Sequence, residues 1–185
     1  MEYLKALDLK LFYLLNSGFA NGLFDFLAPL PEKGLLIAIV LGSLVLIFGR
    51  NARHRVSGFV LLGGYVSGGY ALALLKEFFS RPRPCVALAD ARILFVEPGL
   101  SFPSGHSCAA FMAATYLSAV LGGKAWAWLF PAAALVGLSR IYCGVHYPAD
   151  MLAGAVFGSA FGVLLLAVEK KVRFLFSPSP KNGKA

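Results

Sequence analysis

The chain has 185 residues, of which 58% are apolar and only 14% are charged, and its mean hydropathy is +0.73. Soluble domains carry about 25% charged residues, so this composition excludes an ordinary soluble domain and predicts one domain embedded in lipid. The formal net charge is +8. No stretch interleaves these cations with aromatic residues, so they indicate a membrane face and no nucleic-acid partner.

The cysteines and the N-terminus carry little further signal. Cys85, Cys108 and Cys143 have no metal-ligand spacing. They predict neither a metal site nor a disulfide framework, with a Cys85–Cys143 pair as the less favoured alternative. The opening segment MEYLKALDLK mixes acids with lysines and lacks an apolar core, so no cleavable signal peptide is expected.

The N-terminal segment is amphipathic. Its leucines lie near one helical face, with Lys5, Asp8 and Asn16 off that face, which predicts a helix in the membrane interface. The leucines are Leu4, Leu7, Leu11, Leu14 and Leu15. The following segment, Asn21–Leu30, is apolar but contains Asp25. The possibility that the two segments together, within residues 1–31, form a sixth, imperfect span stays open.

Five later segments are apolar enough for membrane-spanning helices, which need about 20 residues. They are Gly34–Gly49, Val56–Leu75, Ser107–Leu121, Ala125–Ile141 and Ala149–Val168. We therefore expect an all-α, polytopic membrane protein with five to six transmembrane helices and an N-terminal interfacial helix. Residues 1–170 form its single domain, and residues 171–185 are expected to be a basic, disordered cytoplasmic tail.

The basic residues between the spans predict the orientation. Arg50, Arg53, Arg55, Lys124 and the lysines of the tail fall on one side of a five-span topology. The positive-inside rule makes that side cytoplasmic. Further basic residues fall on the opposite side, against the rule, which indicates that they have another role.

Three stretches on that opposite side carry the unusual residues. They are KEFFSRPRP with Lys76 and Arg83, PSGH at residues 103–106, and SRIYCGVHYPAD with Arg140, His146 and Asp150. Arginine and lysine match phosphate oxygens, and Ser104 and Gly105 precede a helix whose free N–H groups favour an anion. An Asp one helical turn after a histidine can orient its ring for nucleophilic attack. Together they predict phosphoryl transfer without a metal.

The pattern KxxxxxxRP, PSGH and SRxxxxxHxxxD resembles the signature of the type 2 phosphatidic acid phosphatase superfamily, which also includes vanadium-dependent haloperoxidases. The resemblance implies that His146 is the nucleophile that forms a phosphohistidine, that Asp150 orients it and that His106 is the general acid. It also implies which residues hold the phosphoryl oxygens, namely Lys76, Arg83, Ser104, Gly105 and Arg140.

Members of this family that are similar in size include undecaprenyl-diphosphate phosphatases and lipid A 1-phosphatases. The resemblance thus implies a lipid-phosphate phosphatase of the bacterial inner membrane that acts at the periplasmic or outer face. Its substrate would be lipid A 1-phosphate, undecaprenyl diphosphate, phosphatidylglycerol phosphate or phosphatidic acid, with no cofactor and no obligate protein partner. A lipid phosphotransferase with the same site, a lipid or anion transporter and, less favoured, a vanadate-dependent oxidase are the alternatives.

Arg81 is not part of the family pattern. It belongs to the first of two Arg-Pro pairs in SRPRP, and only the second pair has the family spacing. Contact with a lipid head group and a position as an interfacial anchor are its two open interpretations.

Overall fold

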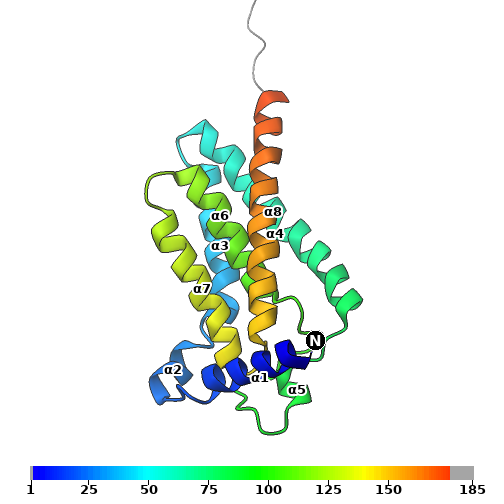
Figure 1. The fold of residues 1–185 in the computed structure, drawn as a ribbon. Coiled ribbons are helices and arrows are strands. Elements are labelled where there is room, and N and C mark those ends of the chain that lie inside the picture. The colour runs from blue at the N-terminus through cyan, green and yellow to red at the C-terminus, as the bar shows by residue number, and fades with distance from the viewer. Residues whose placement is uncertain (1, 176–185) are drawn as a thin grey trace, which may run out of the picture.

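The computed structural model describes residues 2–175, apart from the side chains of residues 52 and 53. This part of the chain forms helices and contains no strand, as Figure 1 shows, which confirms the all-α class. The helices are α1 (Glu2–Asn16), α2 (Gly22–Leu27), α3 (Pro31–Phe48), α4 (Ala52–Phe79), α5 (Pro84–Ala87), α6 (Gly105–Leu121), α7 (Trp126–Tyr142) and α8 (Pro148–Leu175).

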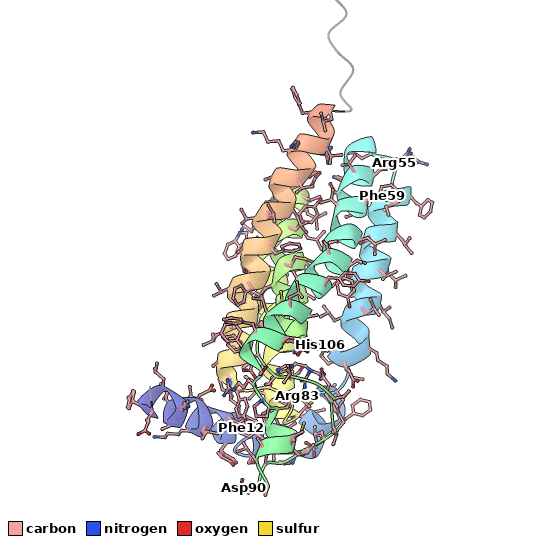
Figure 2. The ribbon with its side chains drawn as sticks, turned by 90° about the vertical axis from the view of Figure 1, so that its right-hand side faces the viewer. Phe12, Arg55, Phe59, Arg83, Asp90 and His106 are labelled. Carbon is pink, nitrogen blue, oxygen red and sulfur yellow. The ribbon has the colours of Figure 1, made fainter. Side chains whose placement is uncertain are left out.

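The five longer helices after α2 form a bundle, and the remaining elements gather at one end of it. Helices α1 and α2 lie across this end, beside α5 and the loop that joins α5 to α6 (Figure 1). Arg55, in the first turn of α4, lies at the other end, far from Arg83 (Figure 2). The bundle therefore separates the basic loop 49–55, whose last residues begin α4, from the three stretches that carry the site residues.

Three helices, α3, α4 and α8, are long and apolar enough to cross a membrane. Helix α8 has 28 residues, about 42 Å at 1.5 Å per residue. Large apolar side chains point outward from these helices, among them Val45, Phe59, Leu74, Val156 and Val163. A bilayer covers such a surface. The chain is a multi-pass membrane protein, and the count of five spans, which includes the 17-residue helices α6 and α7, stays a prediction.

The predicted segments match the helices, but several ends differ. Helices α4 and α8 extend beyond Val56–Leu75 and Ala149–Val168 because polar residues continue them past the apolar core. Residues 171–175 belong to α8, so the predicted disordered tail begins too early, and residues 176–185 lie outside the described part. Residues 2–30 form two separate helices, α1 with 15 residues and α2 with six, and no continuous helix that is long enough for a sixth span. All three cysteines are free.

Helix α1 packs on the rest of the protein with the face that lies opposite most of its leucines. Its buried residues are Asp8, Phe12 and Asn16, which recur every four positions, while Leu4 and Leu14 are exposed. The leucine face therefore points away from the bundle, as in a helix that rests in the membrane interface. Phe12 and Asn16 fix α1 to the end of α7, since Phe12 packs against Ile141 and the Asn16 amide donates to the carbonyl of Tyr142 at 2.9 Å.

Helices α6 and α8 pack closely because glycines line their contact. Gly154, Gly158 and Gly162 recur every four residues along α8. A Cβ on Gly154 would lie 2.6 Å from the carbonyl oxygen of Ser104, and one on Gly162 would lie 2.8 Å from that of Met112. Small residues at this spacing let helix backbones touch. The contact brings the start of α6 against the start of α8, where the Ser104 N–H donates to the Asp150 carbonyl at 3.0 Å.

We expect Gly158→Ala to destabilise the protein by about 1–3 kcal/mol, the usual cost of overpacking. The new methyl group would meet the carbonyl of Cys108 even more closely than at the two flanking glycines, so α6 and α8 would have to separate. Thermal unfolding in detergent measures the effect. Gly63→Ala is the matched control, because no atom lies within 4 Å of a Cβ there. Equal melting temperatures for the two variants would contradict this account of the contact.

Candidate active site

The three predicted stretches meet at the end of the bundle that carries α1 (Figure 2). Arg83 follows α4 and caps the short helix α5, where Pro82 and Pro84 prevent the long helix from continuing. Ser104 is the N-cap of α6 and places Gly105 and His106 in its first turn. His146 lies in the turn between α7 and α8, and Asp150 is in the first turn of α8.

His146 and Asp150 form the centre of the site. Both are fully buried, and His146 Nδ1 lies 3.4 Å from Asp150 Oδ2, which is longer than a normal hydrogen bond. Distances of this kind tighten when substrate binds. The carboxylate is held by two further donors, since the Tyr147 N–H donates to Oδ2 at 2.8 Å and the Ser101 hydroxyl donates to the same oxygen. Asp150 is thus placed to orient the ring.

The opposite ring nitrogen faces a cation. Arg83 Nη1 lies 3.0 Å from His146 Nε2, and because a guanidinium can only donate, Nε2 carries a lone pair and Nδ1 carries the hydrogen. Burial lowers the pKa of His146 to about 4, and the charge of Arg83 acts in the same direction while Asp150 opposes it. His146 is therefore neutral near pH 7, with its lone pair directed toward the cations.

We expect a ¹³C-histidine NMR titration to show His146 still neutral at pH 5.5. The reason is that its pKa lies well below about 6.5, the ordinary value for imidazole, so protonation begins only near pH 4. Loss of one signal in His146→Gln assigns the resonance, and the unfolded protein supplies the reference titration. A midpoint at or above pH 6 in the folded protein would contradict the proposed burial and charge environment.

Glu97 is a part of the site that the sequence analysis did not identify. Its carboxylate accepts from Arg83 Nη2 at 2.8 Å through Oε1 and from Arg140 Nη2 through Oε2. Burial of Glu97 opposes ionisation, but the two guanidinium groups outweigh it and lower its pKa. The two arginines thus converge on one position that holds a pair of anionic oxygens.

The other predicted residues lie around the Glu97 carboxylate, and each makes a different contact. Lys76 Nζ donates to the carbonyl of Leu100 at 2.5 Å, and His106 Nε2 donates to the carbonyl of Glu32 at 3.2 Å. The hydroxyl of Ser104 accepts from the N–H and the hydroxyl of Ser107, so its side chain caps α6. Gly105 lies against Leu72, which leaves little room for a side chain.

A cavity of about 560 Å³ lies beside the site, along α3, α4 and α6. Its polar end is lined by Lys76, Arg83, Glu97, Gly105 and His106. The rest of its wall is apolar and comes from α3, α4 and α6, with Leu35, Leu36, Val66, Leu72, Ala109 and Met112. Most ligand sites have this character, a largely apolar cavity with a few convergent polar groups.

Three residues outside the family pattern reach the site, namely Glu97, Ser101 and Arg81. Arg81 Nη1 donates to Asp150 Oδ1 at 2.8 Å, so its side chain points into the site and is not a free interfacial anchor, while contact with a lipid head group stays a prediction. Local sequence gives no signal for Ser101. Glu97 had an indirect one, because several cations buried together require a compensating anion.

These features define an integral membrane protein with a buried cluster of cations beside a histidine–aspartate pair. The model of the PAP2 superfamily matches residues 57–174. The chain belongs to this superfamily, and it is an enzyme of a family of lipid phosphatases.

Individual relatives agree with this assignment. The chain is 30% identical over 168 residues to undecaprenyl-diphosphatase of Sulfolobus acidocaldarius, covering 88% of this chain and 78% of that protein. The crystal structure of Aquifex aeolicus LpxE superposes with a TM-score of 0.72 and 33% identity, covering 87% of this chain and 95% of that one. A transmembrane PAP2-type phosphatidylglycerolphosphate phosphatase from Bacillus subtilis has a TM-score of 0.75 at 22% identity over 93% and 89% of the two chains, and shares the fold.

Proposed function

We propose that this protein is a metal-independent phosphatase that removes a phosphate from a membrane lipid through a phosphohistidine on His146. The observation that carries the proposal is the shared guanidinium of Arg83, whose Nη1 contacts His146 Nε2 at 3.0 Å while its Nη2 binds the Glu97 carboxylate at 2.8 Å. An anion that replaces the Glu97 carboxylate would therefore bind the same guanidinium that contacts His146 Nε2, the nucleophilic nitrogen. A phosphate monoester there places phosphorus within reach of His146.

Unused donors support the same position for the phosphoryl group. Within residues 2–175, Nε and Nη1 of Arg140 and Nε of Arg83 are buried without a hydrogen-bond partner. Buried donors normally have hydrogen-bond partners. The donors that lack a partner at this site can bind the phosphate oxygens that the other groups do not contact. Lys76 adds a further charge from the cavity wall. This set would stabilise the equatorial oxygens in the transition state.

The reaction follows from the positions of the side chains. His146 Nε2 attacks phosphorus, an N–P bond forms, and the bond from phosphorus to the leaving oxygen breaks. His106, on the cavity wall, gives that oxygen a proton. Asp150 accepts from the Nδ1–H of His146 and balances the charge of the phosphohistidine. Water then attacks phosphorus with His106 as the base, which releases inorganic phosphate and restores both histidines.

The apolar wall of the cavity favours a lipid as the substrate. Its residues on α3, α4 and α6 extend from the cationic end along helices that face the bilayer, so they offer a place for a hydrocarbon chain. Undecaprenyl diphosphate, lipid A 1-phosphate and phosphatidylglycerol phosphate are our candidate substrates. The basic loop 49–55 lies at the opposite end of the bundle (Figure 2), and by the positive-inside rule we place the site at the periplasmic face of the inner membrane.

The test is phosphate release by the detergent-purified protein in EDTA. The panel contains undecaprenyl diphosphate, lipid A, phosphatidylglycerol phosphate and phosphatidic acid. Release from one of them in the presence of the chelator supports the proposal and identifies the substrate. A folded protein that releases no phosphate from any of the four would overturn it, and thin-layer chromatography of the lipid products would then reveal transfer to a second lipid.

A further inference from the structure

Asp150 depends on a chain of charges that begins on the N-terminal helix. Asp8 of α1 is buried, with 8% of its surface exposed, and its carboxylate makes two contacts. Oδ1 accepts from the Ala149 N–H at 2.8 Å, and Oδ2 accepts from Arg81 Nη2 at 2.6 Å. The other arm of Arg81, Nη1, donates to Asp150 Oδ1 at 2.8 Å. One guanidinium therefore bridges two carboxylates from different helices.

Arg81 controls the rotation of the Asp150 carboxylate. Oδ2 accepts from the Tyr147 N–H and the Ser101 hydroxyl and faces His146. Oδ1 accepts from Arg81, and residues 2–175 supply no other donor to it. Without Arg81 a fully buried oxygen would lack a partner, and the carboxylate would gain by turning to share its remaining donors. The oxygen that faces His146 Nδ1 would then leave its place.

Arg81 is itself held from two directions. Its guanidinium carbon lies 3.8 Å from the centroid of the Tyr147 ring, and Asp8 binds its second arm. Phe12, one turn after Asp8, packs against the same tyrosine with ring centroids 5.6 Å apart. Asp8 also accepts from the first turn of α8, where free N–H groups favour a carboxylate. Helix α1 thus fixes both Arg81 and the start of the helix that carries Asp150.

We propose that Asp8 and Arg81 are positioning residues for phosphoryl transfer, which set the orientation of Asp150 and, through it, of His146. The proposal rests on the proposed function, in which His146 is the nucleophile. It gives the interfacial helix α1 a part in the reaction, because α1 supplies the first member of the chain Asp8–Arg81–Asp150–His146.

The test compares the full-length variants Arg81→Gln and Arg81→Lys, with undecaprenyl diphosphate in detergent micelles as the probe. For Arg81→Gln we expect kcat to fall about 10- to 100-fold, the usual cost of a small misplacement of reacting groups, while KM changes less than about threefold because ground-state binding is kept. Because the contact with Asp150 opposes the lowering of the His146 pKa, an Asp150 carboxylate that turns away lowers this pKa further, so the acid limb of the pH–rate profile moves to lower pH.

Arg81→Lys separates geometry from charge. A lysine keeps the charge but has no planar fork to bridge two carboxylates, so kcat falls and the acid limb moves in the same direction as in Arg81→Gln, whereas an effect of charge alone would be absent from this variant. Asp8→Asn keeps an oxygen for Ala149 and weakens only the contact with Arg81. It therefore lowers kcat in a protein that retains its fold, and it keeps the proposal testable if Arg81→Gln does not fold.

Arg92→Gln is the matched control. Arg92 pairs with Asp25, and its guanidinium carbon lies 5.2 Å from the ring centroid of Tyr142. It therefore makes an ion pair and an aromatic contact like those of Arg81, but it does not contact Asp150. We expect unchanged kcat and an unchanged acid limb. If Arg81→Gln behaves like Arg92→Gln while His146→Ala is inactive, the positioning proposal fails and the proposed function stands.

A titration of His146 by NMR tests the positioning proposal without measuring turnover. A lower His146 pKa in Arg81→Gln and Arg81→Lys, and not in Arg92→Gln, supports it even if the wild-type protein releases no phosphate from this lipid. An unchanged His146 pKa in both Arg81 variants overturns it.

Discussion

His146→Ala abolishes phosphate release, with an expected loss of at least about 10⁴-fold, comparable to removal of the central group of a catalytic triad. The side chain supplies the atom that forms the bond to phosphorus, and alanine leaves no substitute. Phosphate release from the lipid that the wild-type enzyme hydrolyses measures the loss. Quenching of the wild-type enzyme with SDS at alkaline pH and ³²P-labelled lipid should also trap a labelled protein, because phosphohistidine forms and breaks during turnover and its N–P bond is stable to alkali.

The control is His54→Ala, which changes a histidine near the basic loop at the other end of the bundle. It should keep both activity and labelling. Labelled protein from His146→Ala would place the phosphoryl group on a different residue, and activity in that variant would end the phosphohistidine mechanism.

Glu97→Gln strengthens the binding of vanadate, which mimics the transferring phosphoryl group. In the wild-type protein the Glu97 carboxylate occupies Arg83 and Arg140, so an incoming anion must displace it. Hydrogen bonds to charged groups are worth about 1.5–3 kcal/mol, and glutamine retains only part of this. We expect the inhibition constant of vanadate to fall about 10-fold or more, measured as inhibition of phosphate release at fixed lipid concentration.

Glu77→Gln is the matched control, since Glu77 is exposed near the end of α4. It should leave vanadate inhibition unchanged. An unchanged or larger inhibition constant in Glu97→Gln would mean that the carboxylate stays on the arginines when the anion binds, and would remove Glu97 as the marker of the phosphoryl position.

Hydropathy alone predicted the long helices, because a bilayer demands continuous apolar segments and the loops between them are polar. Hydropathy was less successful for features that tertiary contacts determine. The leucines of α1 predicted an amphipathic helix but could not show that Asp8, Phe12 and Asn16 would form the face toward the protein. The end of α8 was placed too early because Lys170 and Lys171 look like the start of a tail.

The site was predictable where the residues lie close in sequence or share a known pattern. His146 and Asp150 are one helical turn apart, and the family spacing identified the cations. Glu97, Ser101 and Arg81 come from a connection without repeats or periodicity, so only the folded chain brings them to Asp150 and the arginines. Asp8 is separated from Ala149 by 141 positions, and no local pattern links them.

The bundle divides into two groups of helices. Helices α6, α7 and α8 pack tightly together, and α3 packs mainly on α4; the cavity lies along the seam between the groups. The proposed acid, the nucleophile and Arg140 belong to the first group, whereas Lys76 and Arg83 are at the end of the second. In the reaction that we propose, a phosphate at this seam contacts cations from both groups. Its binding would therefore link the two groups of helices.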